Sequence, residues 1–244
     1  MNPRVNQIIG SIPEKEYQFF EKNLKLVSLD KDQILFDTGQ SPSHVYYPVG
    51  AVISMINDMP DGSSVETHML GKSCMVGVGA VGFPSFYRAK VRTSGLAYRL
   101  PMHCLRTAWA QCPAYVQNAQ KAMQRILMQL SQAVVCSKKH TVDQQLVRWI
   151  LLTLDNTLSP TIAMTQQEMS DLLGYRREAI SLAMHKLSET GLISKSRGEF
   201  TVISREKLEA ASCDCYWIGQ EKVRPSHGVQ FNGDKSPLTG KVMY

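Results

Sequence analysis

One segment of the sequence, MTQQEMSDLLGYRREAISLAMHKL at residues 164–187, specifies two short helices joined by a tight turn. Thr165 and Glu168 have the T-x-x-E spacing of a capping box, and Met164 and Met169 stand where a hydrophobic staple would pack. The first helix therefore has a well-defined start. Gly174 can adopt, at little cost, the left-handed conformation that ends a helix. We expect a helix, a glycine turn and a second helix.

The second helix combines a buried face with an exposed polar stripe. Its apolar residues recur at helical spacing, and its polar residues occupy another face. The next residues, LIS, KSRG and EFTVI, predict a two-stranded hairpin with Lys195 and Arg197 at its tip. This order is typical of a winged helix-turn-helix, whose second helix enters the major groove of DNA. An ordinary solvated helix face is the alternative. The buried face comprises Ile180, Ala183, Met184 and Leu187, and the polar stripe Arg177, Ser181, His185 and Ser188.

The distribution of charge supports this interpretation. Residues 176–197 carry five Lys or Arg against two acidic residues, whereas residues 141–204 as a whole carry six against seven. Positive charge is thus concentrated where DNA would bind. Residues 67–142 carry ten Lys or Arg and no acid, which favours a solvated basic face, with attraction to an anion as the alternative.

The chain upstream changes its period twice. A helix is expected near residues 13–23, and short β-type runs separated by turn signals follow from residue 24 to residue 100, which favours an antiparallel barrel, roll or sandwich. From Pro113 the apolar positions recur every three or four residues, which predicts one long helix. Its narrow seam favours contact with an identical helix, with packing against the chain's own β-domain as the alternative. The seam comprises Val116, Ala119, Met123, Ile126, Leu130, Ala133 and Ser137. A second helix is expected at residues 143–156, burying Trp149.

The stretch GYRREAISLAMHKLSETGLISKSRGEFTVISREKLEAASCDCY resembles the winged-helix domain of the Crp/Fnr superfamily of bacterial transcription regulators. The resemblance continues upstream through VYYPVGAVISMI and DGSSVETHML and covers roughly residues 15–217. It implies an α+β fold with an N-terminal antiparallel β-roll, a dimerisation helix and a C-terminal winged helix-turn-helix. We expect a sensory β-roll at residues 1–112, the dimerisation helix at 113–140 and a DNA-binding domain at 141–218. Residues 219–244 are rich in Gly, Pro, Lys and polar residues and show no periodicity, which predicts a mobile tail.

The resemblance also implies roles for residues of the second helix. Arg177 and Glu178 match the arginine and glutamate that read guanine and cytosine edges, in agreement with the hydrogen-bonding pattern of those bases. Arg176 stands where the family has a Ser or Thr helix cap, and Leu182 where many members have a second reading arginine. We expect Arg176 and Ser181 to contact phosphate or nearby bases, and Leu182 to contact a thymine methyl group. The other expected DNA contacts are Thr165, Gln166 and His185, with Lys195 and Arg197 on backbone phosphate.

The expected effector pocket departs from the family pattern. Members that bind cyclic nucleotides carry a glutamate in a G-E-[LI]-[GA] turn and an arginine in R-[ST]-A. Here Met75, Val76 and Gly77 occupy the first motif without a glutamate. Arg88, between Tyr87 and Ala89, is displaced by one position, which turns a strand side chain to the opposite face. We therefore expect a degenerate pocket that does not bind cyclic AMP in the usual mode, and the effector is unknown.

The cysteines allow a further class of function. Cys136 with His140, and Cys213 with Cys215, could form a Cys₃His metal or redox site if the fold joins them, but two separate buried clusters are favoured because C-x-C alone is a weak motif. A jelly-roll metal enzyme, starting from Glu66 and His68, is a remote alternative. We expect a cytoplasmic, non-enzymatic homodimer, paired through residues 113–137, that binds double-stranded DNA and RNA polymerase, does not bind a membrane, and has no assigned cofactor.

Overall fold

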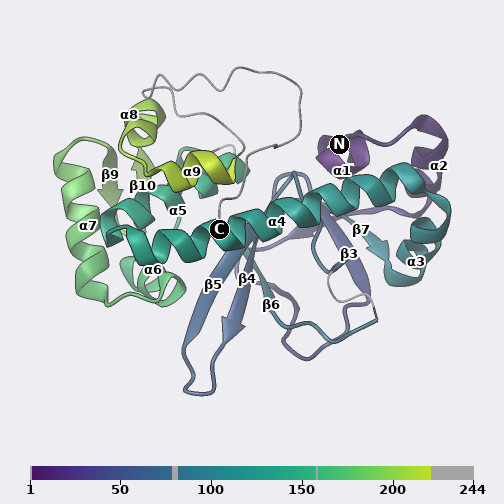
Figure 1. Ribbon diagram of the computed structural model, residues 1–244, viewed down its shortest axis with the longest axis horizontal. Coiled ribbons are helices and arrows are strands. Elements are labelled where there is room, and N and C mark those ends of the chain that lie inside the picture. The colour runs from purple at the N-terminus through teal and green to yellow at the C-terminus, as the bar shows by residue number, and fades with distance from the viewer. Residues whose placement is uncertain (1, 79–81, 158, 221–244) are drawn as a thin grey trace, which may run out of the picture.

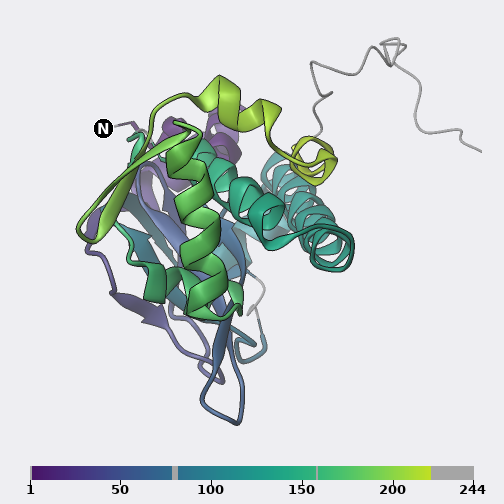
Figure 2. The same ribbon diagram turned by 90° about the vertical axis from the view of Figure 1, so that its left-hand side faces the viewer.

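The computed structural model describes residues 2–78, 82–157 and 159–220. A β-roll and a helical C-terminal domain lie along one long helix, α4 (Pro113–Lys139), which crosses the whole molecule in Figure 1. Figure 2, turned by 90°, shows the C-terminal domain in front of the roll. The predicted α+β fold class is confirmed. No helix in the described ranges is long and apolar enough to cross a membrane. The predicted tail lies outside the described residues from position 221 onward.

The roll consists of two antiparallel sheets, with strand orders β1-β7-β3 and β2-β6-β4-β5. Its alternating sequence pattern produces the expected burial: in β3 the side chains of Val45 and Tyr47 are buried while the residues between and before them are half-buried. The strands follow the predicted β-type runs closely. They are β1 (Lys25–Leu29), β2 (Ile34–Phe36), β3 (His44–Pro48), β4 (Val52–Asp58), β5 (Ser64–Leu70), β6 (Arg88–Thr93) and β7 (Gly95–Pro101).

Short helices pack on strands β3 and β7 of the roll and on α4. The helix predicted near residues 13–23 is α2 (Glu14–Asn23), and it is preceded by a 3₁₀ turn, η1 (Pro3–Val5), and by α1 (Gln7–Gly10). Helix α3 (Met102–Gln111) was not predicted, because it follows β7 without a break and buries only Cys104, Leu105 and Ala108. These helices and the first half of α4 enclose a core around Phe20, Tyr47 and Tyr115.

The orientation of α4 corrects the predicted seam. Ala119 is fully buried in the core of the roll, and Ile126 packs against the roll as well. Val116 is also partly buried in that core. The large apolar side chains that stay exposed on the second half of the helix are Leu127, Val134 and Val135. The first half of the predicted seam and Ile126 thus pack against the chain's own roll, whereas Met123 and Leu130 of the seam stay half-buried beside the exposed Leu127 and Val134.

Ion pairs between strands account for part of the basic segment. Arg88 pairs with Asp37 and Asp58, at 3.0 and 3.1 Å, and Lys90 pairs with Asp32 at 2.8 Å. The Arg88 guanidinium, which hydrogen-bonds the Asp37 carboxylate, lowers the pKa of that carboxyl below its ordinary value. Acids from residues 1–66 thus neutralise bases from residues 67–142, so the segment is less of a free basic face than its composition indicates.

The C-terminal domain packs around a second core, to which a few residues of the roll also contribute. Val52, Ile56 and Met69 of the roll pack in one cluster with Leu146, Trp149 and other residues of this domain. The small sheet, of order β8-β10-β9, contains one strand that the sequence did not predict, β8. The elements are α5 (Val142–Asn156), β8 (Thr161–Ile162), α6 (Gln166–Leu173), α7 (Arg177–Glu189), β9 (Ile193–Ser196), β10 (Glu199–Val202), α8 (Arg205–Ala210) and α9 (Asp214–Gly219).

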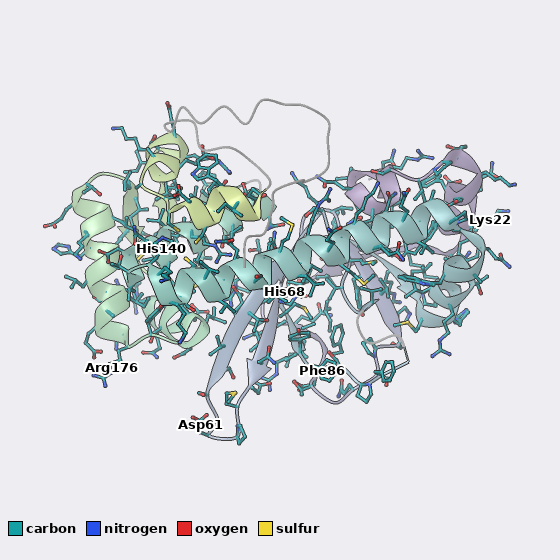
Figure 3. All side chains as sticks on the ribbon, viewed as in Figure 1. Lys22, Asp61, His68, Phe86, His140 and Arg176 are labelled. Atoms are coloured by element: carbon teal, nitrogen blue, oxygen red, sulfur yellow. The ribbon has the colours of Figure 1, made fainter. Side chains whose placement is uncertain are left out.

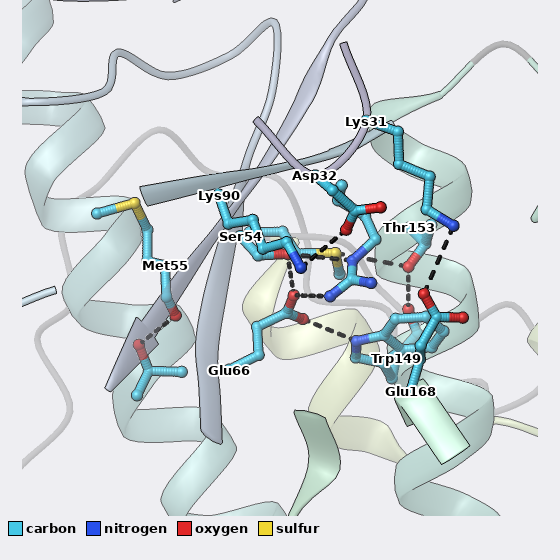
Figure 4. A network of polar contacts seen from close by, with 12 residues as sticks. Lys31, Asp32, Ser54, Met55, Glu66, Lys90, Trp149, Thr153 and Glu168 are labelled. Atoms are coloured by element: carbon cyan, nitrogen blue, oxygen red, sulfur yellow. Dashed lines mark hydrogen bonds and ion pairs between the residues drawn. The ribbon is translucent and has the colours of Figure 1, made fainter. Parts of the chain in front are cut away.

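A buried polar network joins the roll to this domain (Figure 4). The Glu66 carboxylate on β5 accepts a hydrogen bond from Trp149 Nε1 on α5 at 2.8 Å and from the Ser54 hydroxyl. It also lies 3.6 Å from the Arg92 guanidinium, and both charged side chains are less than a tenth exposed. Because a buried charge is costly without a partner, the pair and its hydrogen bonds must form together. Glu66 is therefore committed to the domain interface rather than to an enzymatic metal site.

Candidate nucleic-acid interface

Helix α6 begins and ends where the sequence predicts. The Thr165 hydroxyl accepts a hydrogen bond from the Glu168 backbone N–H at 3.1 Å, and the Glu168 carboxylate accepts one from the Thr165 N–H at 2.6 Å. Both halves of the capping box are thus present. Gly174 ends the helix in the left-handed region, with φ of 69°. The turn that follows fixes the angle between α6 and α7, because its geometry depends on a residue without a Cβ atom.

Helix α7 presents the predicted two faces. Ile180, Ala183 and Met184 are at most 2 % exposed, and Leu187 is buried beside them. Arg176 is the N-cap, and its side chain makes no capping hydrogen bond. This agrees with its replacement of the Ser or Thr typical of the family at this position. The start of α7 is therefore held by packing rather than by a side-chain cap.

The polar stripe of α7 and the wing line one open hollow. Arg177, Glu178, Ser181, Leu182 and His185 form its floor on α7, and Lys195 of β9 forms its side. Leu182 is an apolar residue with 56 % of its surface exposed. It therefore adds an apolar contact surface to an otherwise polar and charged hollow.

A second hollow extends this surface to the start of α6. It is lined by Thr165, Gln166, Arg177 and Lys195 among others, so the two hollows share Arg177 and Lys195. All ten predicted DNA contacts are exposed or half-buried. They lie at the start of α6, at the N-cap and along the polar stripe of α7, and on the hairpin of β9 and β10. Arg197 occupies the turn of that hairpin, followed by Gly198 with φ of 78°.

Two of these residues have particular surroundings. Arg176 lines a different hollow, together with residues of the β4–β5 turn, and Figure 3 labels it near the start of α7, with Asp61 at the tip of that turn. His185 Nε2 lies 3.2 Å from a Glu189 carboxylate oxygen one helical turn away. By contrast, Lys186 is directed away from the stripe and binds the Asp143 carboxylate on α5 at 2.8 Å.

The predicted effector pocket corresponds in part to a cavity of about 340 Å³ between the roll and α4. Met75, Gly77 and Tyr87 line it. Val76 instead exchanges backbone hydrogen bonds with Tyr46, and Ala89 is buried between strands β2 and β4.

Arg88 also lies outside the cavity lining, because its guanidinium binds Asp37 and Asp58. The described residues that line the cavity include no Arg or Lys and are mostly apolar. His68 lines it too, and burial lowers the pKa of this imidazole to about 4, so the ring is neutral at pH 7. The cavity thus offers no charged partner to a cyclic phosphate.

The cysteines depart from the prediction of two separate buried clusters, which was wrong. Cys136, Cys213 and Cys215 form one buried cluster, and His140 lies at its edge, at the end of α4 labelled in Figure 3. The Cys136 and Cys213 sulfurs share a hydrogen bond across 3.8 Å, and this contact lowers the pKa of the Cys213 thiol and raises that of Cys136. The sequence signal was the pair of motifs C-x₃-H and C-x-C, but only the return of α9 along α4 brings them together.

The comparisons with known proteins agree with this architecture. Residues 144–211 match a model described as the Crp-like helix-turn-helix domain. A CRP-family transcriptional regulator from Thermus thermophilus has a similar structure, with 15 % identity, coverage of 76 % of this chain and 96 % of that one, and a TM-score of 0.64. FixK2 from Bradyrhizobium japonicum is 15 % identical, with 78 % of this chain and 98 % of that one covered and a TM-score of 0.65. A crp/fnr-family regulator from Eubacterium rectale is 12 % identical, with 85 % of this chain and 98 % of that one covered and a TM-score of 0.66. No curated protein sequence matches the chain.

The comparisons and the geometry define one class of domain and one fold: residues 144–211 form a Crp-like helix-turn-helix domain, in a chain whose fold resembles that of solved Crp/Fnr regulators. The predicted helix-turn-helix is confirmed as a domain of the Crp-like type.

Proposed function

We propose that this chain is a DNA-binding transcription regulator of the Crp/Fnr type. It would bind an approximately palindromic DNA site as a homodimer, with α7 in the major groove and the wing, the hairpin of β9 and β10, on backbone phosphate. The observation that carries the proposal is the common hollow of Arg177, Glu178, Ser181, Leu182, His185 and Lys195. It combines a bidentate donor, a carboxylate acceptor and an apolar contact on one exposed face. These suit guanine, cytosine and the thymine methyl group respectively.

The remaining positive groups have a supporting role. Lys195 and Arg197 are exposed on the wing, where a cation can approach a phosphate without desolvating other groups. Arg176, Thr165 and Gln166 extend the same contact toward the backbone that flanks the half-site. A sequence-reading centre on α7 is therefore flanked by sequence-independent contacts, as specific DNA binding requires.

Dimerisation through the second half of α4 is the second part of the proposal. Leu127 and Val134, 67 % and 62 % exposed, stand seven residues apart. Met123 and Leu130, both half-buried, continue the same series in alternating steps of four and three residues. This is the a/d spacing of a coiled-coil contact. Two copies paired here would present two α7 helices to half-sites about 34 Å apart.

The input and the partners complete the proposal. Because the cavity lacks a cationic group, we propose an effector other than a cyclic nucleotide bound in the usual mode, or none. We also propose contact with RNA polymerase at promoters, as the family resemblance implies, and the domain division at residues 112, 140 and 218.

Selection of bound sites from random DNA, followed by measurements on variants, tests the reading face. Arg177→Ala should lose about 1 to 3 kcal/mol of discrimination at one base pair of each half-site, because it removes a bidentate contact with guanine. Lys195→Ala should weaken binding to all sequences and reduce the salt dependence by about one phosphate contact. Lys186→Ala, on the same helix but bound to Asp143, is the matched control. Unchanged base preference in Arg177→Ala would refute the proposed reading face.

A further inference from the structure

The four side chains of Cys136, His140, Cys213 and Cys215 converge on one point. Their ligand atoms all lie within 4.8 Å of one another. Cys136 is in the last turn of α4 and His140 caps that helix, so the C-x₃-H spacing places both on one face. Cys213 and Cys215 flank the start of α9, which lies beside the end of α4 in Figure 1.

Two of the distances between the ligand atoms match the edges of a tetrahedral metal site. With Zn–S bonds of about 2.3 Å and a Zn–N bond of about 2.0 Å, the edges of a tetrahedron are about 3.8 Å between two sulfurs and about 3.5 Å between sulfur and nitrogen. Cys136 Sγ lies 3.8 Å from Cys213 Sγ, and Cys215 Sγ lies 3.4 Å from His140 Nδ1. A disulfide would require two sulfurs about 2.05 Å apart.

The surroundings suit a site with a net negative charge. Three thiolates, one neutral imidazole and a divalent cation carry one negative charge in total. Gln132 Nε2 donates a hydrogen bond to Cys215 Sγ at 3.0 Å, so a donor already stabilises one of the sulfurs. Arg148 acts on Cys136 electrostatically, and its buried Nε has no hydrogen-bond partner among the described residues. Such outer partners orient ligands and adjust their charge in metal sites.

We propose that Cys136, His140, Cys213 and Cys215 bind one Zn²⁺ ion in a closed, structural Cys₃His site. Thiolate-rich tetrahedral sites select zinc among the common divalent ions. The site connects α4 directly to α9, two elements whose ligands stand 77 residues apart in sequence. Zinc would thereby fix the C-terminal domain on the helix that we propose for dimerisation, in addition to the Glu66 network. The zinc site itself does not depend on the proposed contacts with DNA.

Metal analysis of the full-length protein, purified without chelator, tests the proposal. We expect one zinc per chain. After removal of zinc, Co²⁺ should give the absorption bands of tetrahedral thiolate coordination, and added Zn²⁺ should displace it. Added zinc should also raise the Tm of the metal-free protein, because the ion binds the folded state. These readouts need no DNA, so they can fail or succeed independently of the proposed reading face.

Variants separate a metal site from a buried cysteine cluster. Cys215→Ser should lose stoichiometric zinc. His140→Ala removes a ligand at a half-buried position. Loss of a residue that only hydrogen-bonds a ligand weakens metal affinity by roughly 10–100-fold, so loss of this ligand should weaken zinc affinity by at least that much. Cys112→Ser is the matched control, because this buried cysteine caps the opposite end of α4, where serine is a favoured cap. Metal-free wild-type protein that takes up neither Zn²⁺ nor Co²⁺, with reactive thiols or with a Cys136–Cys213 disulfide, would overturn the proposal.

Discussion

Replacing Leu127 by alanine tests the proposed dimer at its most exposed apolar residue. Two-thirds of the Leu127 surface is exposed in the single chain, so a partner helix would bury most of the side chain. Complete burial of a leucine side chain contributes about 1.5 to 3 kcal/mol, and a symmetric contact contains two copies. Allowing for the part already covered and for the methyl group that alanine keeps, the dimer should lose about 2 kcal/mol. This corresponds to a dissociation constant about 30-fold higher.

Sedimentation equilibrium over a range of protein concentrations measures this change directly. The free energy of unfolding of the chain should change by no more than about 0.5 kcal/mol, because the side chain is exposed before association. Val135→Ala is the control, since Val135 is also an exposed apolar residue of α4 but lies about 100° around the helix from Val134. If Leu127→Ala leaves the dissociation constant unchanged, or if Val135→Ala has the larger effect, the proposed contact face is wrong.

Two further predictions concern stability. Thr165→Ala should lower the free energy of unfolding by about 1 kcal/mol, because it removes the hydroxyl that accepts the Glu168 N–H, whereas Thr165→Ser should keep most of it; denaturant midpoints of the two variants decide this. The pKa of His68 is about 4 in the folded chain and about 6.5 in the unfolded chain. As the pH decreases, the unfolded chain therefore takes up a proton here before the folded chain does. Stability from this group is complete above pH 6.5 and falls by roughly 3 kcal/mol as the pH decreases to 4. His68→Gln should flatten that part of the pH profile, and an unaltered profile would contradict the assignment.

Local patterns were sufficient to predict the helix-turn-helix. The capping box at Thr165, the left-handed Gly174 and the apolar face of α7 depend on neighbours within a few residues. The strands of the roll were also predictable from local sequence, because alternation of apolar and polar residues indicates a strand with one buried face. Helix α3 and strand β8 escaped because each offers too few periodic positions, the latter only two residues long.

The register of α4 could not be predicted from periodicity. Ile126 and Leu127 are both large and apolar, and so the pattern alone allows either to face the roll. The burial of Tyr115, Ala119 and Ala122 in the core of the roll rotates the helix so that Ile126 packs inward and Leu127 stays exposed. Similarly, nothing local indicates that Cys213 meets Cys136, because the contact depends on how α9 returns along α4.

Strand β5 is the element through which the roll cavity and the DNA-binding domain share contacts. His68 lines the cavity, and Glu66, two residues earlier on the same strand, binds Trp149 of α5. Helix α5 in turn packs on α7. Because Glu66 and Arg92 are buried, the network cannot loosen gradually without exposing an unpaired charge to an apolar core. The lining of the cavity and the face of α7 are thus joined by a short chain of packed elements, from β5 through Trp149 on α5 to α7.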